Sequence, residues 1–183
     1  MTDRTKVGRD PAADARDEVL RRRAESLALE QAEQVEEQRA GLLLFSLGDE
    51  WYGVRIAEVR EIYNEYAITP IPCAPNYIVG VVNIRGEIVS VTDLRVMMGL
   101  PASEARPGAQ QAPVIVVSDT TVSTALLVDT IGDIVDVASD SIEPPLALSD
   151  RAQADYISGT VYSDGRLIAL VNLSRVLTPV VSG

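Results

Sequence analysis

The chain has 183 residues and a formal net charge of −11, and 46% of its residues are hydrophobic although only 4% are aromatic. This acidic balance argues against binding to nucleic acid or to an anionic membrane surface, and no apolar run approaches the ~20 residues of a membrane-spanning helix. There is no histidine, and the single cysteine excludes an internal disulfide or a cysteine-based zinc site.

Residues 1–40 form an N-terminal extension with its own composition. The first ten residues, MTDRTKVGRD, contain no hydrophobic signal region, which predicts a cytoplasmic protein. Residues 14–40 lack Gly and Pro and are compatible with a helix, but glutamines interrupt the apolar series Leu20, Leu27 and Val35. We therefore expect an extension that is helical or partly disordered. The alternative is a helix that docks on a partner or on the domain itself.

The pattern changes to strands after residue 40. Two strands are expected at 42–47 and 51–56, joined by a Gly-Asp-Glu turn. Val59 and Ile62 then lie three residues apart, which predicts one helical turn over 57–62 with Ile62 in the core. In the proline-rich segment 69–75 we expect Cys73 to be a small buried or half-buried filler, because no histidine is present to activate it.

The same series of elements occurs twice. A linker at 101–113 without hydrophobic period predicts an exposed loop, and beyond it YISGTV at 156–161 repeats YIVGVV at 77–82. Small strand-rich units usually close into barrels, which removes exposed strand edges. We therefore predict a mainly β domain over residues 41–179, with two β-barrel lobes at about 42–100 and 114–178.

The two repeats differ at the tip of one hairpin. In NIRGEIVSV, residues 83–91, Arg85 precedes the turn glycine, whereas the equivalent position of the second repeat is Asp164. Tight hairpins favour Asn-Gly or Asp-Gly, so arginine is not there for the turn. Its guanidinium is a candidate to bind a partner's carboxylate or exposed carbonyls. The alternative is an arginine that tolerates the turn and extends into solvent.

No group of residues predicts catalysis. Asp129, Asp133 and Asp136 lack the spacing and the loop glycine of a calcium site, and a solvated acidic face is the expected explanation. The chain has no phosphate-binding glycine motif and no combination of nucleophile, base and oxyanion donor. We expect a binding module without metal or cofactor. An enzyme using Asp, Glu or Tyr chemistry is the alternative, and no motif supports it.

The sequence resembles the CheW family of bacterial chemotaxis adaptors. The resemblance rests on LFSLGDEWYGVRIAEVREI, on TPIPCAPNYIVGVVNIRGEIV at 69–89, on VTDLR and on the later YISGTV, and it extends over about residues 42–177. It implies two intertwined five-stranded SH3-like barrels and a scaffold without catalytic activity. It also implies two partners, a chemoreceptor cytoplasmic tip and the regulatory domain of a CheA-type histidine kinase, in rings associated with membrane-bound receptor arrays.

The resemblance places receptor binding on Arg85, Val59 and Glu61. It also makes Val114 and Val116 part of an apolar groove wall that receives a receptor helix. It assigns no residue of this chain to kinase binding.

Two positions near the expected groove depart from the family pattern, Pro113 and Ala125, so the receptor preference of this chain is expected to differ. The chain has neither the phosphotransfer histidine of a kinase nor a receiver domain, which predicts a free-standing adaptor. The alternative is an accessory protein whose N-terminal helix recruits a different partner for localisation or array assembly.

Overall fold

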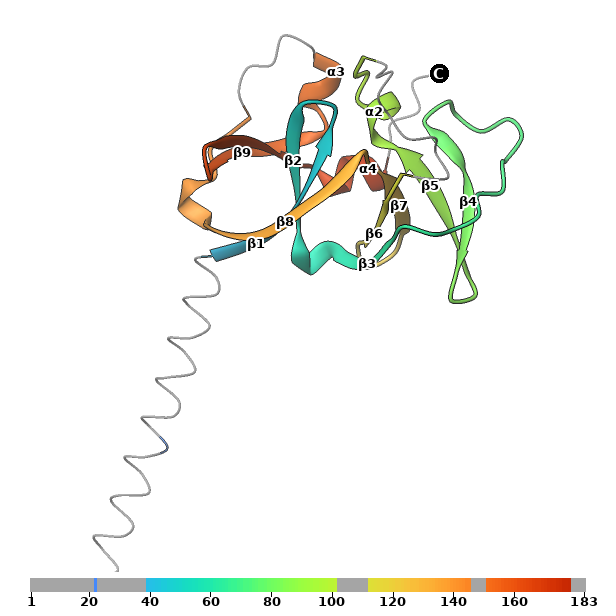
Figure 1. Cartoon of the computed structure of the whole chain (residues 1–183), viewed down its shortest axis with the longest axis horizontal. Coiled ribbons are helices and arrows are strands. Elements are labelled where there is room, and N and C mark those ends of the chain that lie inside the picture. The colour runs from blue at the N-terminus through green and yellow to red at the C-terminus, as the bar shows by residue number, and fades with distance from the viewer. Residues whose placement is uncertain (1–21, 23–38, 102–111, 146–150, 179–183) are drawn as a thin grey trace, which may run out of the picture. The chain divides into compact units, whose positions relative to one another are not determined.

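The computed structural model describes residues 22, 39–101, 112–145 and 151–178. The predicted N-terminal helix and most of the linker at 101–113 therefore lie outside the described residues. The prediction of a mainly β fold is confirmed (Figure 1). The elements in chain order are β1 (Arg39–Leu47), β2 (Glu50–Arg55), η1 (Ile56–Glu58), β3 (Val59–Tyr63), β4 (Ile78–Ile84), β5 (Glu87–Asp93), α2 (Leu94–Met97), β6 (Val114–Ser118), β7 (Ser123–Leu127), β8 (Thr130–Ala138), η2 (Ser139–Ser141), α3 (Arg151–Ala154), β9 (Ile157–Ser163), β10 (Arg166–Val171) and α4 (Leu173–Leu177).

The strands form two five-stranded sheets that exchange strands between the repeats. Sheet A has the order β8-β1-β2-β10-β9, and sheet B has the order β3-β6-β7-β5-β4. Replacing each strand by its counterpart in the other repeat converts one order into the other. The intertwining is thus as the resemblance implies, but the sheets do not coincide with the halves 42–100 and 114–178. That expected division into lobes is corrected.

The chain crosses from sheet A to sheet B where β2 leads into β3, and it returns to sheet A where β7 leads into β8. The connecting turn η1 is flanked by Arg55 at ψ 131° and Val59 at ψ 125°, both extended. A hairpin turn would reverse the chain beside β2. Here the chain stays extended and continues from sheet A into sheet B. Strands β2 and β10 pair in parallel, as do β5 and β7, and each of these pairs joins one strand from each repeat. The other pairs between repeats, β1 with β8 and β3 with β6, are antiparallel.

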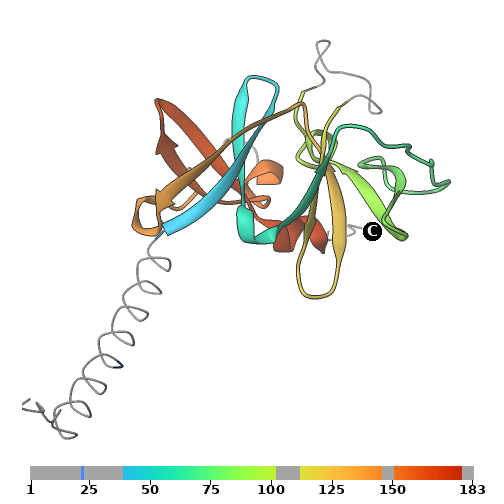
Figure 2. The same ribbon diagram turned by 60° about the horizontal axis from the view of Figure 1, so that its bottom comes forward.

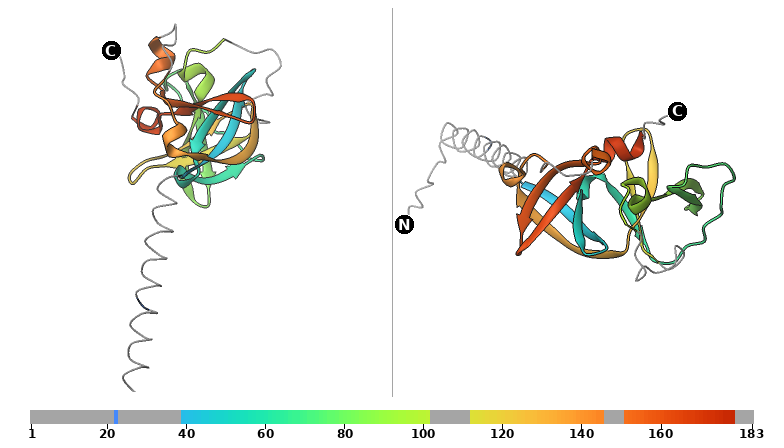
Figure 3. Two further views of the ribbon diagram at one scale, coloured as in Figure 1. Left: turned by 90° about the vertical axis from the view of Figure 1, so that its left-hand side faces the viewer. Right: turned by 90° about the horizontal axis from the view of Figure 1, so that it is seen from above.

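Both faces of the central strands are buried. Successive residues of β1 point to opposite faces, so Leu42 and Leu44 pack inside sheet A while Leu43 and Phe45 enter a core that also contains Ile115 of sheet B. A third cluster fills the inside of sheet B. Figures 2 and 3 show the two curved sheets, with the blue and red strands in one and the green and yellow strands in the other. The shared core joins the two sheets.

In each sheet an isolated bridge covers part of the outer edge of one terminal strand, β4 or β9, next to a glycine. Thr69 and Val81 exchange backbone hydrogen bonds of 2.8 and 2.9 Å along β4, and Glu143 and Thr160 do the same along β9. At Gly80, beside the first bridge, an added Cβ would lie 2.4 Å from the carbonyl oxygen of Thr69. Pairing at these positions removes part of an edge at which another chain could add a strand.

We expect Gly80→Ala to lower the free energy of unfolding by about 1–3 kcal/mol, because the methyl group overlaps backbone that can move only by breaking the bridge. The equivalent Gly159→Ala provides a graded control, since its added Cβ would lie 2.9 Å from the carbonyl oxygen of Glu143. Urea unfolding of both variants measures whether Gly80→Ala lowers the free energy of unfolding more than Gly159→Ala does. A larger loss for Gly159→Ala would contradict this explanation.

Two local predictions are wrong. Residues 59–63 form strand β3 instead of a helical turn, and Ile62 is 42% exposed. Pairing of β3 with β6 overrides the i, i+3 spacing that suggested a helix. Cys73 is exposed, with φ +60°, because the proline-rich segment holds it in a surface turn.

A buried ion pair ties three connections together. Arg95 of α2 contacts Asp129 at 2.5 Å between Nη2 and Oδ2, with 7% and 10% of the two side chains exposed. The same Asp129 oxygen accepts a 2.7 Å hydrogen bond from the backbone of Gly48, and Arg95 donates to the carbonyl of Pro101 at 2.6 Å. Asp129 is therefore not part of a solvated acidic face, and that expectation is corrected for this residue.

Candidate functional site

The hairpin that joins β4 and β5 has a two-residue turn with positive φ at both central positions. Arg85 has φ +51° and Gly86 has φ +89°, which is the backbone of a type I′ turn. The side-chain oxygen of Asn83 accepts a 2.8 Å hydrogen bond from the Gly86 amide and supports the turn. The sister hairpin has the same backbone, with Asp164 at φ +48°. A long side chain at this position is unfavourable locally, which favours a role outside the turn.

Arg85 reaches from the hairpin to strand β3. Its Nη2 atom lies 3.2 Å from Oε2 of Glu61, and 78% of the Arg85 side chain is exposed against 24% of Glu61. The hydroxyl of Tyr63 donates a hydrogen bond to the same Glu61 oxygen. A hydrogen bond that Arg85 donates to the hydroxyl oxygen of Tyr63, followed by the negative charge of Glu61, raises the pKa of Arg85. The structure thus brings two of the predicted site residues, Arg85 and Glu61, into contact.

A β-bulge in β3 orients Glu61. Val59 is paired with Val117 and Glu61 with Val116, so one residue of β3, Arg60, has no partner in β6. Bulges redirect side chains, and this one lies immediately before Glu61. Glu61 and Tyr63 then point to the same side of the strand because they are two residues apart. Sequence reasoning missed Tyr63. Its position two residues after Glu61, on the same face of a strand, was the available signal.

A second ion pair joins β3 to the base of the hairpin. Arg60 lies 3.1 Å from the carboxylate of Glu87 and donates a 3.0 Å hydrogen bond to the hydroxyl of Ser123. Both charged side chains are nearly half exposed, so this pair contributes little stability. Together the two pairs hold the hairpin against β3, and they leave the outer surface of Arg85 open to solvent.

The apolar residues predicted for the site have different environments. Val59 is half-buried and packs against the core shared by the sheets. Val114 and Val116 are 0% and 1% exposed and lie in the core of sheet B. Their side chains cannot form a wall of a surface groove, and that expectation is corrected. Sequence alternation did not reveal it, because β6 is buried on both faces.

The two positions that depart from the family pattern have structural roles of different kinds: one side chain is buried, and the other residue contributes its backbone carbonyl. Ala125 is fully buried opposite Val116, so its small side chain fits between strands β6 and β7. The carbonyl of Pro113 accepts a 3.1 Å hydrogen bond from the amide of Val128. Proline suits this place just before β6, since the position supplies an acceptor and has no donor of its own.

Among the described residues, no group of three or more Cys, Asp or Glu side chains is placed to hold a metal ion. In the same part of the chain, no helix is long and apolar enough to cross a membrane.

Tyr52 is a buried titratable group on sheet A. It is 2% exposed, and its hydroxyl donates a 2.7 Å hydrogen bond to Oε2 of Glu50. Burial, followed by this hydrogen bond and the negative charge of Glu50, raises the pKa of Tyr52 far above its ordinary value. The phenol is therefore neutral throughout the physiological range.

We expect the free energy of unfolding to fall as the pH rises above about 10, the ordinary pKa of tyrosine. Above this pH the unfolded chain releases the Tyr52 proton while the folded chain keeps it, so alkali favours unfolding; below it this contribution is complete. Urea unfolding between pH 8 and 12 measures the slope. In Tyr52→Phe the slope above pH 10 should be shallower, and an unchanged slope would contradict the assignment.

Comparison with known proteins places the fold in one family. Residues 41–180 match the family model described as the CheW-like domain. The chemotaxis protein CheW of Rhizobium meliloti (strain 1021) is 33% identical over 135 residues, which cover 74% of this chain and 85% of that protein. Protein FrzA of Myxococcus xanthus is 32% identical over 135 residues, covering 73% of this chain and 82% of FrzA.

A solved structure has the same fold. The crystal structure of the scaffolding protein TtCheW from Thermoanaerobacter tengcongensis matches with a TM-score of 0.66 and 28% identity, over 73% of this chain and 88% of that one. The family model covers more than half of the chain, and the two five-stranded sheets agree with this structural match. The chain therefore belongs to the CheW-like family.

Proposed function

We propose that this protein is a non-catalytic scaffold of bacterial chemosensory signalling, which couples chemoreceptor signalling tips to a CheA-type histidine kinase. Family membership supports the scaffold role, since similar proteins carry the names of chemotaxis and scaffolding proteins. The proposed partners are the cytoplasmic receptor tip and the regulatory domain of the kinase. The proposed location is the cytoplasm, at membrane-bound receptor arrays.

The contact between Arg85 and Glu61 is the observation that carries the receptor part of the proposal. The arginine of the hairpin and the acid of β3 are 24 residues apart in the chain, and the fold brings them to a distance of 3.2 Å. A highly exposed guanidinium at the tip of a rigid hairpin can exchange its exposed ion pair for a polar group of a partner at little cost. Half-buried Val59 lies two residues from Glu61 and supplies an apolar neighbour for a helix.

The test is co-sedimentation of the full chain with membranes that contain receptor, in the presence and absence of the kinase. We expect the chain to sediment with receptor and to increase the amount of kinase in the pellet. A chain that sediments with neither partner would refute the proposed function. Recruitment of the kinase without any binding to receptor would refute the receptor site alone.

A further inference from the structure

The hairpin of β9 and β10 carries exposed apolar side chains that the proposed receptor site does not use. Tyr162 and Leu167 are directly paired across the two strands, and 71% and 52% of these side chains are exposed. Paired large apolar residues that face solvent on a sheet are typical of interaction surfaces. They lie on sheet A, whereas Arg85 and Glu61 belong to sheet B.

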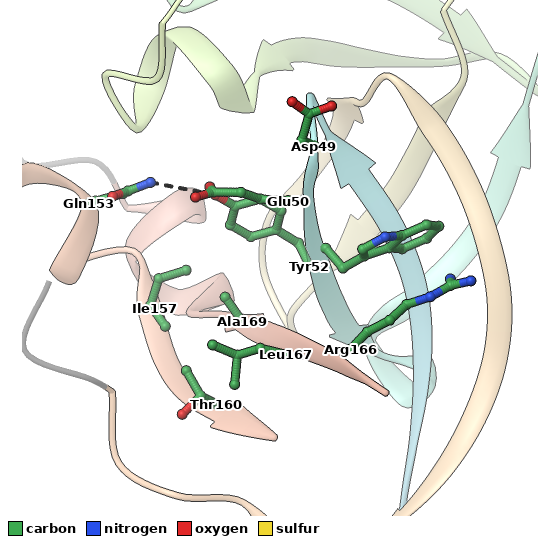
Figure 4. A pocket seen from close by; sticks show the side chains of 10 residues that line it. Asp49, Glu50, Tyr52, Gln153, Ile157, Thr160, Arg166, Leu167 and Ala169 are labelled. Atoms are coloured by element: carbon green, nitrogen blue, oxygen red, sulfur yellow. Dashed lines mark hydrogen bonds between the residues drawn. The ribbon is translucent and has the colours of Figure 1, made fainter. Parts of the chain in front are cut away.

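A pocket of about 380 Å³ adjoins this pair, with Leu167 in its lining. In Figure 4, Ile157, Leu167 and Ala169 lie below Tyr52 and form an apolar floor. Gln153 and Arg166 lie on opposite sides of the pocket. The residues that line it are Asp49, Glu50, Trp51, Tyr52, Gln153, Ile157, Thr160, Arg166, Leu167 and Ala169.

Glu50 and Gln153, at one side of the pocket, are engaged with Tyr52. Glu50 accepts a hydrogen bond from Tyr52, and the Gln153 amide is 3.5 Å from the same phenol oxygen. These contacts fix the side chains and leave the pocket open above its apolar floor. The volume is sufficient for one large side chain of a partner.

The opposite side carries a positive charge. The Arg166 guanidinium lies 4.6 Å from the ring centroid of Trp51, and within the described residues no ion pair joins it to a carboxylate. Stacking on Trp51 orients the guanidinium and removes part of its hydration, which strengthens an ion pair with an incoming carboxylate. In a chain of net charge −11, such a cation is suited to recognise an acid.

We propose that the surface formed by this pocket and the Tyr162–Leu167 pair is a second docking site, which binds a polypeptide segment that carries a large apolar side chain close to an Asp or Glu. The apolar side chain enters the pocket over Leu167 and Ala169, and the neighbouring carboxylate pairs with Arg166. Tyr162 covers the flank of the bound segment. Charge complementarity at Arg166 selects an acidic segment over a basic one, and the site does not depend on receptor binding through Arg85.

The test uses fluorescence, because Trp51 is the only tryptophan of the chain. The full chain is titrated with a panel of synthetic ten-residue peptides, each with one Leu or Phe and one Asp placed one to four residues away. Matched peptides carry Lys in place of Asp. We expect saturable changes in Trp51 fluorescence with the acidic peptides and binding at least about tenfold weaker with the Lys peptides. If no acidic peptide binds, or if the Lys peptides bind equally well, the proposal is overturned.

Variants separate this site from the receptor site. Arg166→Gln should weaken binding of the acidic peptides about tenfold. Leu167→Ser should weaken binding of the acidic and the Lys peptides alike. Arg85→Asn, on the sister hairpin, is the matched control and should leave peptide binding unchanged. Circular dichroism and the thermal midpoint verify that each variant is folded. Equal peptide affinity in wild type and folded Arg166→Gln would overturn the proposal, whereas loss of binding in Arg85→Asn would show that the peptides bind at the other hairpin.

Discussion

Arg95→Met is expected to lower the free energy of unfolding by about 3–5 kcal/mol, because it leaves the carboxylate of Asp129 buried without its cation. Arg95 also donates to the carbonyl of Pro101, and that acceptor loses its partner in the variant. The ion pair links α2, the β7–β8 connection and the β1–β2 turn at Gly48, so the loss should affect both sheets together. Urea unfolding followed by circular dichroism measures it.

The double variant Arg95→Met/Asp129→Leu is the control for this mechanism. Removing both charges eliminates the buried carboxylate that has lost Arg95, so the double variant should be more stable than Arg95→Met alone. Recovery should be incomplete, because the amide of Gly48 then lacks its acceptor. A loss below about 1 kcal/mol for Arg95→Met would place the pair among surface ion pairs and contradict the burial argument.

Arg85→Asn is expected to weaken sedimentation with receptor membranes about tenfold or more while the fold remains intact. Asparagine tolerates the positive φ at this position and lacks the charge, so the substitution removes the guanidinium while keeping the turn. It is a cleaner probe than Arg85→Asp, in which a second carboxylate would face Glu61. Receptor co-sedimentation gives the affinity, and the thermal midpoint should not fall.

The matched control is Asp164→Asn at the tip of the sister hairpin, where φ is +48°. It alters the same position of the same turn type on sheet A, and receptor binding should be unchanged. Equal weakening by both substitutions would indicate a general effect of hairpin tips. Unchanged receptor binding in Arg85→Asn would remove Arg85 from the proposed receptor site.

Much of the fold could be read from local pattern. Apolar runs bounded by turn residues located the strands, and the internal repeat showed two equivalent units, because both signals can be read along the chain without knowing which strands pair. The contrast between Arg85 and Asp164 identified the one hairpin tip at which turn chemistry is not followed, and both residues have the expected positive φ. A local rule suffices there, since two-residue turns depend on the backbone of a few adjacent residues.

Features that depend on distant partners could not be read in this way. Burial of Val114 and Val116 follows from neighbours on both faces of β6, and the ion pair of Asp129 depends on an arginine 34 residues away. Tyr63 belongs to the site because its hydroxyl donates to the same Glu61 oxygen that Arg85 contacts, and Arg85 lies on a separate hairpin. Each of these was missed or misplaced, since periodicity records the direction of a side chain and not what lies opposite.

The sequence by itself determined the strand-rich composition, the duplication, the two hairpin turns and the exceptional arginine. Only the tertiary structure decided which strands pair. The repeats have the same apolar pattern, which does not reveal that β1 pairs both with β2 of its own repeat and with β8 of the other. The extended path through η1 carries β3 into the second sheet. The surface at Trp51 and Arg166 likewise exists only because β2 and β10, more than 100 residues apart in the chain, pair in parallel.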